Sequence, residues 1–586
     1  MRSTTSTEAR NGQSASSVRL SRRTAMRATA GGVASVMAAG QLPRSLAARA
    51  QDDPEGGVVL TLPVYPHGQQ LILDPHRATN WGPHWVILPH VWAGLLGFDE
   101  NGAVVPVLAR SVEPEQDGLV WVATIAPDAT FASGNPVTAQ AMIDGWRRAI
   151  RPQRPAPLSH YMRRVAGFDD YLAGESEEIG FEVRDERTVA ITLSEPYALF
   201  REDLATFVWA AVDVEALENV PDSQTAFANA SAGRWRFVDS GADGTIRMEP
   251  NENATGLPES FSAVVWRSME GPQAVEAGIE AYRNGEIPVA DVTPLILDSS
   301  AGEGLEADLQ SVSSPGSTML IGMDYNQAPF DNPDVRRAIA RAIDRERWAS
   351  EIMGGTFMPA ESITPPVLAE TAGYQAPDSL AFDPDAARQL LQDAGITEDT
   401  MPQVTLYQPA ESPESEIEQV AALIAMIQEN SGLVIEHDTT LTAEQIDALR
   451  NDNGGLQLAV RWWWPLTSSP SGLADLALPD SSSMDGWFNW SEDAESAEVA
   501  EAARTFTESI QQAQATMDDD ARNQLFAQAE EILLQNAVFV PLGYWVQRFV
   551  QSSSLAGTRQ GAFTGYVPLV LDEAVTFTPT TSTPTG

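Results

Sequence analysis

Three consecutive tryptophans, Trp462, Trp463 and Trp464, follow an apolar stretch that begins at Leu458 and includes Arg461. Tryptophan presents a large flat apolar face with one N–H donor, which suits stacking on sugars, aromatic rings or cations. Packing in a core is the commoner use of any single tryptophan. Alternate side chains of a strand face opposite sides, however, so the three rings cannot all point into one core. We therefore expect at least one of them to face a ligand cleft or solvent.

The residue types that are missing exclude several kinds of chemistry. The sequence has no cysteine and no lysine, so all 36 basic residues are arginines. Disulfides, thiolate nucleophiles and cysteine-based metal sites are therefore excluded. Phosphate-binding loops with a lysine, SxxK acylases, Schiff-base enzymes and protein kinases are excluded as well. We expect a protein that is not an enzyme and needs no cofactor.

One enzymatic alternative stays open, an extracellular carbohydrate-active hydrolase. Such an enzyme needs only two well-placed carboxylates and aromatic platforms for the sugar. The chain is rich in both, but nothing in the sequence singles out two carboxylates among its 81 acidic residues. Neither a GxSxG nor a HExxH motif occurs.

Four of the six histidines, His67, His76, His84 and His90, lie close together in the sequence. Their spacings match no common metal-ligand motif. We expect ordinary surface or core histidines and no metal site.

The formal net charge of -45 opposes binding to nucleic acids and to anionic lipid surfaces, because affinity for both depends on basic residues. Dense surface carboxylates favour a soluble, exported monomer.

The first 50 residues have the order of an export signal. Ser21 to Arg27 is basic and resembles a twin-arginine signal, although Ala25 stands where a larger apolar residue is usual. The apolar stretch Ala28 to Ala39 is too short to span a bilayer, and Ala48-Arg49-Ala50 offers a cleavage site. We predict export to the periplasm or the outer face of the cell membrane.

The remaining chain alternates strand and helix patterns, which predicts an α/β fold. Short apolar runs at Val58 to Leu62, Leu119 to Ile125 and Thr188 to Leu193 are typical of strands. Helices are predicted after the capping residues Thr138 and Asn332.

Two further helices and a strand are predicted towards the C-terminus. One helix begins at Asp383-Pro384 and ends at Gly395, and another covers Ala521 to Leu534. Val538 to Val546 is predicted to be a strand that returns to the first sheet. The helix after Asn332 carries arginines outside its apolar stripe, and we expect them to form a solvated face rather than an anion-binding one: Arg336, Arg337, Arg341 and Arg345.

Seven sequence blocks, in this order, resemble the extracellular solute-binding proteins of ABC importers, family 5. The block around Phe131 to Ala139 is the most specific. The blocks are Leu73-Asp74-Pro75; Gly94-Leu95 with Val105 to Ala109; Asp117-Gly118 with Phe131 to Ala139; Asp185 to Leu193 with Pro196; Pro329-Phe330 with Asp334 to Ile339 and Asp344-Arg345; Asp383-Pro384 to Gly395; and Ala537 to Tyr544.

This resemblance implies a two-lobe, periplasmic-binding-protein-like clamp of the large cluster C type, with a discontinuous first lobe. The implied first lobe comprises residues 51–317 and 538–575, and the second lobe residues 318–537. We expect the tail, 576–586, to be disordered, since it consists almost entirely of Thr, Pro, Ser and Gly.

The resemblance also implies a solute held between the lobes and handed to an ABC permease. By family position, Trp81, Tyr325 and Asn326 join the tryptophan run as cleft candidates. The aspartate that pairs with the ligand's ammonium group in peptide-binding members is replaced by Leu466, which puts a peptide ligand in doubt. A ligand-sensing partner of a membrane receptor would use the same clamp without transport.

Overall fold

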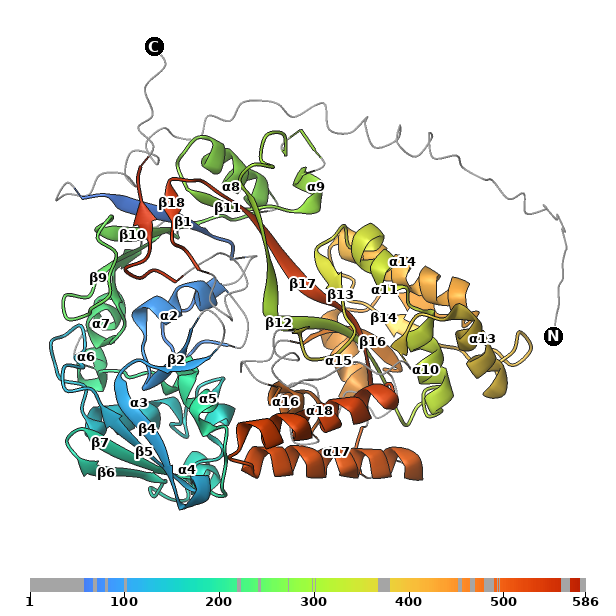
Figure 1. The fold of residues 1–586 in the computed structure, drawn as a ribbon, viewed down its shortest axis with the longest axis horizontal. Helices are drawn as coiled ribbons and strands as arrows, with labels where there is room; N and C mark the ends of the chain where they lie inside the picture. The colour runs from blue at the N-terminus through green and yellow to red at the C-terminus, as the bar shows by residue number, and fades with distance from the viewer. Residues whose placement is uncertain are drawn as a thin grey trace, which may run out of the picture. The chain divides into compact units, whose positions relative to one another are not determined.

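The computed structural model describes residues 57–66, 71–79, 83–99, 103–218, 223–240, 244–271, 273–297, 299–300, 302–366, 380–451, 456–463, 470–478, 490–492, 494, 496–559 and 570–579. The chain divides into two compact units, Met1–Gln51 and Asp52–Gly586. The first unit lies outside the described residues, and with it the predicted export signal. All helices and strands in Figure 1 belong to the second unit.

A four-stranded sheet in the predicted first lobe has the strand order β1-β10-β9-β8. β1 is parallel to β10, and the other neighbours are antiparallel. Leu60, Trp235 and Trp266 from this sheet belong to one buried apolar cluster. The strands are β1 (Val59–Val64), β8 (Trp235–Ser240), β9 (Ile246–Pro250) and β10 (Ala263–Ser268).

A second, antiparallel four-stranded sheet has the order β4-β5-β7-β6. Helix α3 (Ala139–Ala149) contacts β6 and β7 of this sheet. The Thr138 side chain caps α3 by accepting a hydrogen bond from Ala141 N at 3.1 Å. Met142 and Trp146 on the buried face of α3 belong to the large apolar cluster that also contains Trp121 of β5. The strands are β4 (Ala109–Glu115), β5 (Val120–Ile125), β6 (Phe181–Asp185) and β7 (Thr188–Thr192). The strands and the cap predicted from the sequence are confirmed here.

The third sheet joins segments that lie far apart in the sequence. Its order is β11-β17-β12-β16-β14-β15, and β13 also pairs with β17. Its strands are β11 (Val289–Asp291), β12 (Leu309–Met323), β13 (Phe357–Pro359), β14 (Thr405–Tyr407), β15 (Glu436–Asp438), β16 (Leu458–Trp463) and β17 (Phe539–Gln551).

The two longest strands, β12 and β17, pair antiparallel over most of their length (Figure 1). The register is interrupted between Ser313 and Thr318, where β12 contains Pro315 and Gly316. On one side of this interruption β17 also pairs with β11, and on the other side β12 also pairs with β16. These two strands therefore form a narrow connection between two larger bodies of structure.

The helices of the predicted second lobe begin where the sequence predicts them. Asn332 caps α10 (Pro333–Ala342), and Asp383 caps α13 (Pro384–Asp393), each by accepting a backbone N–H bond. The helices α17 (Ala497–Ala515) and α18 (Asp519–Gln535) are consecutive along the chain and pack against one another. The other helices of this region are α11 (Arg345–Arg347), the π-helical η5 (Trp348–Ile352), α14 (Glu414–Ser431), α15 (Ala443–Asn451) and α16 (Gly472–Ala477).

The remaining elements are short, apart from α7 and α8. They are η1 (Pro83–Val86), α2 (Leu88–Val91), β2 (Leu96–Phe98), β3 (Val104–Pro106), η2 (Gln116–Gly118), η3 (Ser159–Met162), α4 (Phe168–Ala173), α5 (Phe200–Ala205), η4 (Phe207–Trp209), α6 (Val214–Glu218), α7 (Ser223–Ala230), α8 (Ala274–Arg283), α9 (Pro294–Leu297), β18 (Leu555–Ala556) and β19 (Thr576–Phe577).

The C-terminal segment packs into the apolar cluster of the first four-stranded sheet. Leu555, Leu571 and Val575 are buried there, and Trp235 Nε1 donates to Leu571 O at 3.3 Å. The predicted disordered tail is wrong at its first two residues, because β19 pairs with β18 and Phe577 N donates to Ser260 Oγ. Residues 580–586 lie outside the described residues.

The prediction of a solvated arginine face on α10 is also wrong for Arg336, which has 0% exposure. Its guanidinium donates to Asn536 O at the end of α18 and to Phe330 O, and it stacks on the Tyr325 ring at 4.3 Å. Arg345 is partly buried and donates to Pro541 O and Leu380 O. These carbonyls need donors, and the long arginine side chains supply them from inside the lobe.

Candidate ligand site

The tryptophan run alternates sides, as its strand geometry requires. Trp463 is 2% exposed and sits opposite Thr318 of β12, whereas Trp462 sits opposite Met319 and is 42% exposed. The prediction that at least one ring of the run faces outward is therefore confirmed. Trp464 and Leu466 lie outside the described residues.

Trp462 continues a row of aromatic rings on the second-lobe side of the long sheet. Its ring centroid lies 5.1 Å from that of Phe357, which lies 5.1 Å from that of Trp348. Gly543 makes this packing possible, since a Cβ there would come within 2.5 Å of the Trp348 ring. The exposed indole face of Trp462 therefore rests on a rigid aromatic base.

The same face of the sheet continues across the narrow connection. Phe357 sits opposite Trp545 of β17, and Gln547 is two residues further along the same strand. Residues two apart on a strand share a face. Gln547 Nε2 in turn donates to Asp291 Oδ1 on β11 at 3.4 Å. We call Trp462, Phe357, Trp545 and Gln547 the connecting face.

Three of the other predicted site residues differ in accessibility. Arg461 is partly buried, and its Nη1 donates to Val460 O at 3.3 Å. Asn326 is exposed, with its backbone N bonded to Asp324 Oδ1 at 2.9 Å. Tyr325 is 2% exposed and donates its hydroxyl to Ala537 O, so its ring has no surface left for a solute. Trp81 lies outside the described residues.

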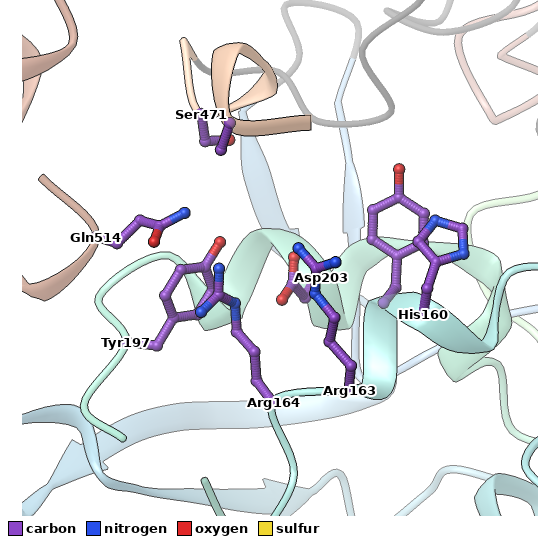
Figure 2. A pocket seen from close by; sticks show the side chains of 9 residues that line it. His160, Arg163, Arg164, Tyr197, Asp203, Ser471 and Gln514 are labelled. Atoms are coloured by element: carbon purple, nitrogen blue, oxygen red, sulfur yellow. The ribbon is translucent and has the colours of Figure 1, made fainter. Parts of the chain in front are cut away.

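A small pocket lies where the predicted lobes touch away from the long strands (Figure 2). Ala198 N donates to Gln514 O at 2.7 Å, and Ser471 Oγ donates to Glu202 Oε2 at 3.1 Å. In Figure 2 the arginines rise from the first-lobe side, while Ser471 and Gln514 come from the second lobe. The lining residues are His160, Tyr161, Arg163, Arg164, Tyr197, Asp203, Ser471, Ala474 and Gln514.

The volume of this pocket decides what it can hold. It is about 30 Å³, which is room for roughly two water molecules. The Arg164 guanidinium already covers the Tyr197 ring at 3.8 Å. The pocket is therefore a seam between two surfaces that touch, and it is too small for a peptide or a sugar.

His76, His84 and His90 take structural positions, and His67 lies outside the described residues. The Arg148 guanidinium binds both oxygens of Asp74 and also contacts His76 Nδ1 at 2.8 Å. Burial lowers the pKa of His76 to about 3 and that of His90 to about 4, so both rings are neutral at pH 7. Among the described residues, no group of three or more His, Cys, Asp or Glu side chains could hold a metal ion.

Comparison with known proteins agrees with this arrangement. The model of the bacterial extracellular solute-binding proteins, family 5, matches residues 103–485. The chain belongs to this family. The sequence blocks that resemble the family contain residues that build the frame described above. Asp74, Thr138 and Arg336 are examples.

Curated relatives of this family 5 protein include binding proteins for peptides. The periplasmic oligopeptide-binding protein OppA of Salmonella typhimurium is 25% identical over 508 residues, 85% of this chain and 88% of that protein. The glutathione-binding protein GsiB of the same species is 24% identical, covering 80% of this chain and 86% of that protein. The dipeptide-binding protein DppE of Bacillus subtilis is 22% identical, covering 83% and 87%.

Solved structures give the same fold. The unliganded open form of the murein tripeptide-binding protein MppA has a TM-score of 0.71 at 18% identity, covering 89% of this chain and 97% of that one. Haemophilus influenzae OppA in complex with RPPGFSPFR has a TM-score of 0.65 at 20% identity, covering 88% and 98%. The family 5 protein is thus a two-lobe α/β clamp. Among the described residues, no helix is both long and apolar enough to cross a membrane.

No sequence motif identifies most residues of the connecting face or its neighbour Asp291. Phe357, Trp545, Gln547 and Asp291 come together only because β13, β17 and β11 pair in one sheet. The available hint was the apolar, aromatic strand pattern predicted for Val538 to Val546.

Proposed function

We propose that this family 5 protein binds a peptide-like solute between its lobes and hands it, chemically unchanged, to an ABC permease. The connecting face carries the proposal. It offers an exposed indole on a rigid aromatic base in the second lobe, and it runs along the narrow connection to a polar pair in the first lobe. Extended peptides use both features, because aromatic platforms bind side chains and sheet-like surfaces align backbones.

The proposed lobes meet at the register interruption of β12 and β17. The proposed boundary near residue 317 falls at this interruption, whereas on β17 the interruption lies between Tyr544 and Val546, several residues after the proposed boundary near 538. Two strands that change partners there form the proposed pivot, since hinges are short segments that absorb backbone changes. Closure over the solute would bring the lobes together and give the permease a shape to recognise.

The remaining parts of the proposal concern the cell. We propose export through the twin-arginine-type signal of residues 1–50 and action as a monomer at the outer face of the membrane. The relatives are named for binding oligopeptides, glutathione and a dipeptide, and these names support a peptide-like solute. The replacement of the family's ammonium-binding aspartate by Leu466 means that the solute's charged end would need another partner.

The two alternatives make different predictions. A carbohydrate-active hydrolase would turn over its ligand, whereas a binding protein returns it unchanged. A sensing partner would bind the same solute without uptake, and a receptor gene beside this gene would favour it over an importer operon. Membership of the family supports solute binding and so counts against the hydrolase, while the gene neighbourhood separates transport from sensing.

A thermal-shift screen with pooled di-, tri- and tetrapeptides and glutathione tests the proposal. A ligand at about 100 times its Kd stabilises the folded state by about 2.7 kcal/mol, which is readily seen as a rise in Tm. Trp462→Ala should weaken binding of any hit by about tenfold or more, because it removes the stacking surface.

Phe382→Ala is the matched control, since Phe382 is 44% exposed and lies outside the connecting face. It should leave the shift unchanged. Equal binding by wild type and Trp462→Ala would show that the solute sits elsewhere, and no shift from any pool would reject a peptide-like solute.

A further inference from the structure

Asp291 ends strand β11 beside the narrow connection, and the structure gives its carboxylate few partners. Among the described residues, the recorded hydrogen bond to this carboxylate is the one from Gln547 Nε2, at 3.4 Å. The Asp291 backbone N–H donates to Tyr65 Oη at 3.3 Å. No ion pair to Asp291 is found among the described residues, although arginine pairs are common elsewhere in the chain, as with Asp74 and Arg148.

The residues around this carboxylate are tightly packed, while Asp291 itself is partly buried. Gly278 of α8 is required for the approach of Tyr65, because a Cβ there would lie 2.3 Å from the Tyr65 hydroxyl oxygen. Val289 and Ala290 before Asp291 are fully buried, and Gln547 is 3% exposed. Burial raises the pKa of the Asp291 carboxyl well above its ordinary value.

A partly buried carboxyl among apolar neighbours is costly to ionise when no cation pairs with it. Buried acids are normally paired or bonded by several donors, and an uncompensated one marks a functional position more often than a structural one. One long hydrogen bond from an amide does not compensate a full negative charge. A cation supplied from outside this part of the chain would therefore favour the ionised carboxylate and be bound by it.

The position of Asp291 relative to the aromatic residues fits a bound solute. Asp291 meets the connecting face through Gln547, which shares its strand and its face with Trp545. Trp545 sits opposite Phe357, whose ring centroid lies 5.1 Å from that of the exposed Trp462. A solute stacked on Trp462 and lying along this face reaches the first lobe at Asp291.

We propose that Asp291 is the anchor for an ammonium group of the solute, and that Gln547 is a positioning residue that orients the carboxylate. This inference rests on the proposed function and names the chemistry that its ligand must carry. A cation at this place supplies the counter-charge and turns a destabilising carboxylate into a binding contact. A solute held by Asp291 and stacked on Trp462 would contact both proposed lobes.

The test uses the full-length mature protein and two tripeptide libraries. The libraries are made in parallel and are free of Lys, Arg and His. One has free amino termini and the other is N-acetylated, so that the terminal ammonium is the only cation that differs between them. Bound peptides are released by denaturation and quantified by mass spectrometry.

Three proteins are compared: wild type, Asp291→Asn and Asp308→Asn. Asp308 is the matched control because it is a first-lobe acid that accepts from the Tyr282 hydroxyl at 2.6 Å and lies away from the connecting face. Wild type and Asp308→Asn should retain free-amine peptides at least tenfold better than acetylated ones. Asp291→Asn should lose this preference, while its ligand-free Tm should rise, because an uncompensated charge has been removed.

The outcomes separate the inference from the proposed function. Equal retention of both libraries by wild type would overturn the anchor and leave the proposed function standing. An unchanged preference in Asp291→Asn would do the same, and a fall in its ligand-free Tm would assign Asp291 a structural role. Retention of neither library by wild type would overturn the proposed function, and the inference with it.

Discussion

Two charged residues of this protein, Arg336, which is buried, and Asp291, which is partly buried, have opposite surroundings. Arg336, in the second lobe, donates to the carbonyls of Phe330 and Asn536 and stacks on the Tyr325 ring. Asp291, in the first lobe, receives one long hydrogen bond from Gln547 and has no ion pair among the described residues. Arg336 holds α10 to the end of α18, whereas the Asp291 carboxylate contributes one long hydrogen bond, to Gln547 of β17. We infer that a charged side chain with several partners has a structural role. We expect a charged side chain with few partners to be available for binding a solute.

Removing Arg336 should have the largest effect on stability. We expect Arg336→Ala to lower the free energy of unfolding by about 3–5 kcal/mol, because several buried carbonyls lose a charged donor and a cation–π contact disappears. Equilibrium urea unfolding followed by tryptophan fluorescence measures this. Arg337→Ala is the control: Arg337 bonds Gln535 O from a more exposed position and should cost about 1 kcal/mol or less. Equal losses of unfolding free energy in Arg336→Ala and Arg337→Ala would contradict the structural role assigned to Arg336.

Glu530 is a buried carboxylate that has the donors Asp291 lacks. It accepts from Ile363 N at 2.6 Å, Thr364 N at 2.8 Å and Thr364 Oγ1, and burial raises its pKa to about 7. A carboxyl whose pKa is raised on folding stabilises the protein below its unfolded pKa and loses this contribution as pH rises. We expect the unfolding free energy to fall between about pH 5 and pH 8 by up to about 3 kcal/mol.

This decline with pH should be missing in Glu530→Gln and kept in Asp308→Asn. Differential scanning calorimetry at half-unit pH steps follows it. A flat profile in wild type would mean that the three donors keep Glu530 ionised throughout.

Asp74 extends the comparison to a carboxylate that does have a cation. Burial alone would raise the pKa of Asp74, but the Arg148 guanidinium lowers it below its ordinary value. The stabilising contribution is therefore present at neutral pH and is lost as the pH falls below about 4. Asp74→Asn should cost about 2 kcal/mol at pH 7 and little at pH 3, as measured by urea unfolding at both pH values. A larger cost at pH 3 would contradict this assignment.

Asp291→Asn should have the smallest effect on the ligand-free protein, and in the opposite direction. We expect a gain of about 1 kcal/mol at pH 7, since an amide is cheaper to bury than an uncompensated carboxylate. The same urea experiment measures it beside Asp308→Asn, which should not gain. A loss of stability would place Asp291 with Arg336 among the residues of the frame.

The sequence predicted much of this frame and little of the site. Helix caps at Thr138, Asn332 and Asp383 are local features, so their residue types sufficed. The opposite exposures of Trp462 and Trp463 follow from strand geometry alone. These features depend on neighbours a few residues away.

The predictions that failed depend on distant segments. Arg336 is covered by the end of α18, about 200 residues later in the chain, which no helical pattern reveals. Asp291 acquires its surroundings from β17, whose Gln547 is 256 residues away. Thr576 and Phe577 form a strand only because Leu555 and Ala556 offer an edge. Among 81 acidic residues, a single one with too few partners can be found only once the fold is known.

Mass spectrometry of what the purified mature protein releases on denaturation tests the central claim most directly. We expect about one intact, peptide-like molecule with a cationic group per chain, and we expect the same molecule to raise the Tm when it is added back to the emptied protein. Recovery of cleaved fragments of an added ligand, or of an intact sugar or anion with no cationic group, would contradict the account.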